Sequence, residues 1–161
     1  MMKTITFKAP CHIGDTIYYV QTRKKNNKYT FRMKKRVVCG FLIKDFRKYV
    51  CVKDRSGIDG TIDVSMDCVS TNRNIIKAAY KILIAKNSLK TKRSNIFSTG
   101  VYAVFSEIIS VRSEYELGEQ FTNRYKEQDT VMGILVRNEN EIASIMGEDG
   151  GVYSFLELEE N

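Results

Sequence analysis

The sequence predicts a mainly β fold with some helix, arranged as two small antiparallel units joined by a basic α-helix and linker. Three observations predict it: a repeated pattern, short apolar runs separated by Asp- and Gly-containing turns, and an uneven distribution of charge along the chain. We expect units at residues 1–70 and 101–161, with the helix and linker at 71–100. A chain of 161 residues suits one ordinary domain or two very small ones.

The repeat is clearest between residues 36–57 and 129–150, which align without a gap at an offset of 93. The identical pairs are Val38/Val131, Gly40/Gly133, Leu42/Leu135 and Gly57/Gly150. At most of the other positions an apolar residue aligns with an apolar residue and a polar residue with a polar one. Residues 4–15 also align with 108–119 at an offset of 104, so the first copy carries an 11-residue insertion. We interpret this pattern as an internal duplication, with coincidence between two β-rich halves as the alternative.

Each copy consists of strand-like runs rich in β-branched residues. The first copy is expected to hold strands at 3–8, 15–22, 37–43, 49–53 and 61–69. The second copy is expected to repeat the last three at 131–136, 142–146 and 152–158. Five short antiparallel strands are enough for a sheet to curl shut and remove its exposed edges.

The order of these elements resembles the SH3-like small barrels of the Tudor and KOW type. An Ile/Leu-Gly-Asp/Glu turn at 13–15 and 117–119 precedes a Val-x-Gly strand, and an acidic Gly-containing turn precedes the last strand. The resemblance concerns layout and implies two such barrels, with Gly40 and Gly133 marking sharp bends. It implies binding of nucleic acid or peptide tails and does not imply catalysis.

The insertion predicts a cationic β-hairpin arm with a turn at Asn26-Asn27. The arm and the linker supply the candidate nucleic-acid-binding residues, which are Arg23, Lys24, Lys25, Lys28, Tyr29, Phe31, Arg32, Lys34, Lys35, Arg36, Lys90, Lys92 and Arg93. Cations neutralise phosphates, and rings stack on unpaired bases. Two other interpretations stay open: a solvated edge hairpin that discourages aggregation, and a contact with an acidic protein.

A helix is expected to begin at Ser70, Thr71 or Asn72, each of which is able to cap it. Its apolar stripe has helical spacing and is expected to pack against a barrel. Residues 87–95 form a basic linker, and residues 101–105 fit either an added strand or a helical turn.

Charge divides the chain into opposed parts. Residues 1–72 carry a net charge of +9, residues 73–100 carry +7, and residues 101–161 carry −9. The acidic unit is expected to contact a basic protein or to fold against the basic arm and hide it. Its candidate protein-binding residues are Glu139, Glu141, Glu148 and Asp149.

The sequence offers little support for an enzyme, a cofactor or a metal site. The spacing of the four cysteines, Cys11, Cys39, Cys51 and Cys68, does not match a zinc site. The single histidine, His12, follows Cys11 directly, but adjacent residues in a strand point to opposite faces, so the two do not indicate a catalytic Cys-His pair. Walker, GxSxG, HExxH and GxGxxG motifs are absent from the sequence. We expect a cytoplasmic protein because the sequence has neither a secretory signal nor an apolar run of membrane length.

The resulting hypothesis is a non-enzymatic, nucleic-acid-associated binding protein. The basic arm and connector would contact the phosphate backbone of DNA or RNA, and the acidic barrel would contact a protein. The alternative is a phage or mobile-element inhibitor of the anti-defence or anti-CRISPR type, which binds a host protein that handles nucleic acid. The Lys- and Asn-rich composition with a single proline suits an AT-rich genome or a mobile element.

Overall fold

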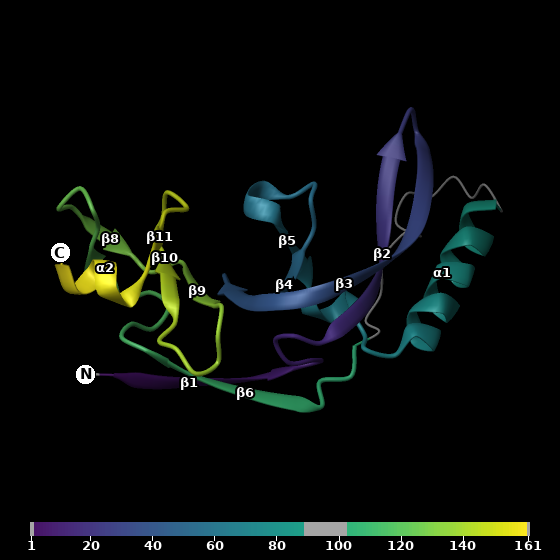
Figure 1. Ribbon diagram of the computed structural model, residues 1–161. Helices are drawn as coiled ribbons and strands as arrows, with labels where there is room; N and C mark the ends of the chain where they lie inside the picture. Colours follow the sequence, from purple (N-terminus) through teal and green to yellow (C-terminus); the bar gives the residue numbers. More distant parts are fainter. Residues whose placement is uncertain (1, 89–102, 161) are drawn as a thin grey trace.

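The computed structural model describes residues 2–88 and 103–160, which form a mainly β protein. The elements in the first half are β1 (Lys3–Ala9), β2 (Thr16–Lys25), β3 (Lys28–Lys44), β4 (Arg47–Lys53), η1 (Ile58–Gly60), β5 (Thr61–Ser65), η2 (Met66–Cys68) and α1 (Arg73–Ser88). Those in the second half are β6 (Glu107–Ser113), β7 (Gln120–Thr122), β8 (Gln128–Thr130), β9 (Gly133–Val136), β10 (Ser144–Met146), β11 (Val152–Tyr153) and α2 (Phe155–Glu160). Figure 1 shows an elongated molecule with α2 near one end and α1 near the other.

The long strand β3 organises the largest sheet. Its first part pairs with β2, and its last part lies between β4 and β9 in the order β11-β10-β9-β3-β4-β5. The pairing of β3 with β4 shifts register between Val38 and Gly40, a bulge that turns the strand. A side chain at Gly40 would place its Cβ 2.6 Å from the carbonyl oxygen of Val136 in β9. Glycine therefore permits the close approach of β9 to β3.

Two antiparallel strand pairs join the two halves of the chain. β1 pairs with β6 along its whole length, and β3 pairs with β9. β1 and β6 form a ribbon that runs beneath the larger sheet in Figure 1. The segments expected to be separate units thus share hydrogen-bonded sheet edges.

Each shared pairing places one residue directly opposite its own repeat equivalent. Thr6 faces Ser110, which is its equivalent at an offset of 104, and Leu42 faces Leu135, its equivalent at an offset of 93. Strands that meet antiparallel at equivalent residues are related by a local twofold axis. Each of the two shared strand pairs is therefore locally symmetric.

The same hydrogen bonds recur at equivalent turns. The Gly14 N–H donates to the Val38 carbonyl at 2.8 Å, and the Gly118 N–H donates to the Val131 carbonyl at 2.8 Å. Both glycines have positive φ, 96° and 86° respectively. These matching contacts support the duplication predicted from sequence.

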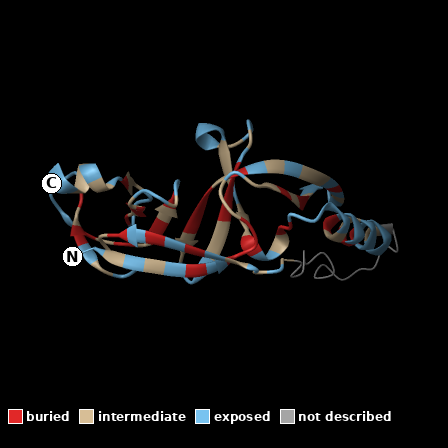
Figure 2. Ribbon diagram, turned by 60° about the horizontal axis from the view of Figure 1, so that its bottom comes forward, coloured by how far each residue is buried: buried red, intermediate tan, exposed pale blue. Residues whose placement is uncertain are grey.

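The main core lies between the β1–β6 ribbon and the large sheet, and both halves contribute to it. Phe7 meets Phe41 edge to face with ring centroids 5.5 Å apart, and Phe121 meets Tyr153 at 5.2 Å. All four rings are buried. In Figure 2 the buried residues run through these central strands, whereas the outer surface of α1 is exposed.

Helix α1 packs on the arm formed by β2 and β3, and this corrects the expectation that it packs on a barrel. Ile76 and Leu83 are buried together with Val20 and Phe31 in a second, smaller core. The helix begins after Asn72, whose side-chain oxygen accepts a hydrogen bond from the Asn74 N–H at 3.0 Å. Asn72 is therefore the cap among the three candidates.

The strand expected at 152–158 is wrong beyond its first two residues. β11 ends at Tyr153, and α2 follows. The Glu157 N–H donates to the Ser154 hydroxyl at 3.2 Å, which caps the helix. The strand expected at 61–69 also ends early, because β5 stops at Ser65 and η2 follows it.

The segment 101–105 lies partly outside the described residues. Residues 103–105 belong to neither a strand nor a helix. The Ala103 N–H donates to the Asp67 carbonyl at 3.1 Å and so ties this segment to the end of η2.

Candidate nucleic-acid interface

The predicted arm is a two-stranded hairpin made of β2 and the first part of β3. Its turn residues Asn26 and Asn27 have φ of 53° and 61°. Two consecutive residues with positive φ form the type I′ turn that suits the twist of a hairpin, and asparagine tolerates this conformation. The expected turn is confirmed, and the arm extends away from the α2 end of the molecule (Figure 1).

The register of the hairpin sorts the cations of the arm by face. Residues directly opposite each other in an antiparallel pair project to the same side. The register pairs Arg23 with Thr30, Lys25 with Lys28 and Gln21 with Arg32. We call this side the open face, and its cations are Arg23, Lys25, Lys28, Arg32, Lys34 and Arg36. Six of the eight predicted arm cations therefore share one face.

The remaining predicted arm residues lie on the opposite face, which α1 covers. Phe31 is only 6% exposed and is unavailable for stacking on a base, which corrects its assignment as a contact residue. Tyr29 packs against the same small core. The ammonium of Lys24 lies 5.6 Å from the centroid of the Tyr29 ring, and Lys35 shares this side of the arm.

Arg36 differs from the other cations of the open face because its charge has a partner. Its Nε donates to Oδ2 of Asp54 at 3.1 Å, and its Nη1 donates to the Lys35 carbonyl at 2.8 Å. Hydrogen bonds from the Ser56 hydroxyl and backbone N–H, followed by those from Arg36, lower the pKa of Asp54 to about 2. Arg36 therefore ties the base of the arm to the turn after β4.

The other five cations of the open face have no carboxylate partner in residues 2–88 and 103–160. Each of them except Lys34 is classed as exposed, and Lys34 is half-buried. The second half of the chain lies away from the arm (Figure 1). The expectation that acidic residues hide the arm is wrong for the described residues.

Helix α1 adds a row of cations that were not among the candidate residues predicted from the sequence. Arg73, Lys77 and Lys81 are exposed and recur every four residues, so they lie along one flank of the helix. Helix α1 contains no acidic residue. The i, i+4, i+8 spacing of lysine and arginine in the sequence was the signal for this row. The predicted contacts Lys90, Lys92 and Arg93 lie outside the described residues.

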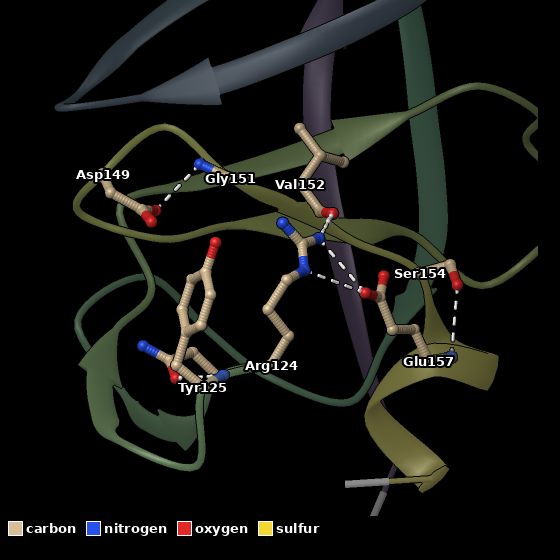
Figure 3. A network of polar contacts seen from close by, with 8 residues as sticks. Arg124, Tyr125, Asp149, Gly151, Val152, Ser154 and Glu157 are labelled. Carbon is tan, nitrogen blue, oxygen red and sulfur yellow. Dashed lines mark hydrogen bonds and ion pairs between the residues drawn. The ribbon is translucent and has the colours of Figure 1, made fainter.

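The four predicted protein-binding residues lie in two different turns. Glu139 and Glu141 precede β10, whereas Glu148 and Asp149 follow it, so they lie at opposite ends of this strand. Asp149 accepts a hydrogen bond from the Gly151 N–H at 2.9 Å and shapes its own turn (Figure 3).

Glu139 is partly engaged within the molecule. Its Oε2 lies 3.5 Å from Nδ1 of His12, while Nε2 of His12 lies 2.8 Å from Oε2 of Glu107. The hydrogen bond with Glu107, followed by that with Glu139, raises the pKa of His12. The only histidine of the chain therefore bridges the two halves.

Figure 3 shows how α2 is held against the β7–β8 hairpin. The Arg124 guanidinium lies over the Tyr153 ring, 4.3 Å from its centroid. It donates a hydrogen bond to the Val152 carbonyl at 2.9 Å (Figure 3). It also pairs with Glu157 at 3.1 Å. This hairpin occupies the position of the arm in the second half and is far shorter.

The four cysteines form no disulfide bond with one another in the structure. Cys11 and Cys51 are buried, and Cys39 and Cys68 are half-buried. Burial raises the pKa of Cys11 to about 12, with smaller effects from Asp15 and Glu107, and such a thiol is a weak nucleophile. Across the described residues, no cluster of three His, Cys, Asp or Glu side chains is suited to hold a metal ion.

Comparisons with known proteins give no match. No family model, no curated protein and no solved structure matches the chain. Among the described segments, no helix has the length and apolar character needed to cross a membrane.

Proposed function

We propose that this protein binds nucleic acid through the open face of its arm. The observation that carries the proposal is the hairpin register, which gathers six cations on one side and leaves five of them without a carboxylate partner in the described residues. Helix α1 packs against the other side of this ribbon. A cationic surface supported in this way suits the regular negative charge of a phosphate backbone.

Binding of this kind depends steeply on salt. Each phosphate neutralised by Lys or Arg releases a counterion and adds about 0.9 to the logarithmic salt slope on duplex DNA. If all five unpaired cations contact phosphates, the slope is about 4.5. A slope near zero would exclude the open face as a phosphate-binding surface.

The direct experiment removes the five charges and keeps the side-chain stems. The arm variant changes Arg23, Lys25, Lys28, Arg32 and Lys34 to Gln. Its matched control carries the same loss of charge elsewhere in the first half, by changing Lys8, Lys44, Arg47, Lys53 and Arg55 to Gln. We expect the arm variant to lose generic DNA binding in about 50 mM salt and the control to retain most of it. Equal losses would show that net charge, and not the arm, determines binding.

We also propose that each half of the chain is an SH3-like unit. The shared order of turns and strands and the equivalent bonds of Gly14 and Gly118 support this proposal. The pairing of β1 with β6 means that each unit would borrow a strand edge from the other. NMR contacts between backbone amides of the first and last strands of each half would test the assignment, because an SH3-like unit closes into a barrel.

A second candidate function follows from the separation of charge along the molecule. The cationic arm lies near one end, and the acidic turns of the second half lie toward the other (Figure 1). A phage or mobile-element inhibitor that docks on a nucleic-acid-handling protein would use both ends. Reversal of Glu141, Glu148 and Asp149 to Lys should then abolish capture of that host protein. If capture from nuclease-treated lysate occurs and survives this reversal, the acidic turns are not the contact.

A further inference from the structure

The two aromatic rings of the arm face away from its cations. Phe31 is buried with Val20, Ile76 and Leu83. Tyr29 is partly buried against the same cluster, and Lys24 lies over its ring. Helix α1 thus covers the two rings that would otherwise be able to stack on bases.

The open face offers charge without an accessible ring. Between the cations it carries Thr30 and Gln21 toward the tip and Tyr19 toward the base. Tyr19 is only 4% exposed and belongs to the main core. Proteins that bind single strands combine a basic groove with exposed aromatic side chains on which the bases stack. Within the described residues, the open face has only the first of these two components.

From this arrangement we infer that the nucleic acid bound by the open face is double-stranded DNA, held by its phosphates. The inference rests on the proposed function and names its substrate class. Alternate residues along a strand are about 6.8 Å apart, so the cations of the open face form regularly spaced rows. Arg32 and Lys34 have this spacing on one strand, as Arg23 and Lys25 have on the other.

The shape of the arm also favours DNA over RNA. The major groove of B-DNA, about 12 Å wide, admits a two-stranded β-ribbon. The major groove of an A-form RNA duplex is deep and narrow and does not admit protein elements of this kind. The tip of the arm, with Lys25 and Lys28 flanking the Asn26-Asn27 turn, is the part that would enter the groove.

The first test compares three labelled probes of one sequence, each about 20 nucleotides or base pairs long, by fluorescence anisotropy in about 100 mM salt. We expect the full chain to bind the DNA duplex at least about tenfold more tightly than the DNA single strand or the RNA duplex. Equal or tighter binding of either competitor would overturn the inference and leave the proposed function standing. Absence of binding to all three in about 50 mM salt would overturn both.

Two variants test the reason for the preference. Phe31→Leu keeps an apolar side chain against α1 and should leave the affinity for every probe within about twofold, because the ring does not contact nucleic acid. Thr30→Tyr places a ring on the open face and should raise single-strand affinity at least about fivefold relative to Thr30→Leu. A fall in single-strand binding with Phe31→Leu, in a protein of unchanged thermal stability, would show that the ring does reach the bases.

Discussion

Thr6 and Ser110 face each other at the centre of the β1–β6 ribbon, with their hydroxyl oxygens 3.1 Å apart. They are equivalent residues of the two sequence copies. The same is true of Leu42 and Leu135 in the larger sheet. The two aligned segments therefore meet at equivalent positions in both of the strand pairs that join the halves, and only the first half of the chain carries the cationic arm.

Gly40→Ala tests the junction between the halves. The new methyl group would lie 2.6 Å from the Val136 carbonyl oxygen, so β3 and β9 must separate. We expect a loss of about 1 to 3 kcal/mol in the free energy of unfolding, measured by urea denaturation. Gly133→Ala is the matched control at the equivalent position, where the nearest atom is Met146 Cβ at 3.3 Å. A control that costs as much as Gly40→Ala would contradict this account.

His12 predicts a pH dependence of stability. Its pKa is raised in the folded state by the hydrogen bonds with Glu107 and Glu139. The stabilisation is therefore complete below the unfolded-state pKa of about 6.5 and is lost as pH rises through the higher folded-state value. In the His12→Gln variant, the change of the thermal midpoint with pH that His12 causes in this range should disappear. Because the chain has one histidine, the imidazole NMR signals belong to His12 and report its folded-state pKa directly. A value at or below the ordinary one would refute the bridge.

Leu83→Ala tests the docking of α1 on the arm. Leu83 is 1% exposed and packs in the same cluster as Phe31. We expect the substitution to cost about 2 to 5 kcal/mol if the helix and arm unfold with the rest of the protein. Circular dichroism during urea denaturation measures this cost. Ile82→Ala, at a neighbouring position that is 51% exposed, should change stability by less than about 0.5 kcal/mol. Similar effects of the two changes would mean that α1 does not pack as described.

Arg124→Ala tests how α2 is held. The substitution removes the stacking on Tyr153 and the hydrogen bond to the Val152 carbonyl. We expect faster hydrogen exchange at the Leu158 amide, which donates to the Ser154 carbonyl within α2. Glu127→Ala, in the same turn, is the control because no ion pair or hydrogen bond of its carboxylate occurs in the described residues. Unchanged exchange in Arg124→Ala would show that α2 is held by other contacts.

The positions of most strands and turns could be predicted from the sequence. The elements against which each strand or helix packs could not. Apolar and polar residues alternate from 29 to 33, which is typical of a strand with one covered face, and Tyr29, Phe31 and Met33 do pack on one side of the arm. That α1 covers this face depends on long-range packing, which the alternation does not specify. The assignment of Phe31 as a stacking residue failed for this reason.

Two other differences have distinct causes. The Ser154-x-x-Glu157 spacing is the signature of a helix start, so α2 was predictable, but the apolar character of residues 152–158 favoured a strand. The β1–β6 pairing was not predictable, because equivalent strands have similar patterns. A strand such as β1 would be able to pair with a strand of its own half or with one of the other half, and the alternation of its residues does not distinguish between the two partners.

The β1–β6 pairing also determines the order in which the protein is able to assemble during translation. Thr6 leaves the ribosome 104 residues ahead of Ser110. At about 5 to 20 residues per second, the first strand therefore waits about 5 to 20 s for its partner. Throughout that interval a nascent chain exposes the edge of β1, and it is then that a chaperone or a neighbouring nascent copy has the opportunity to bind it.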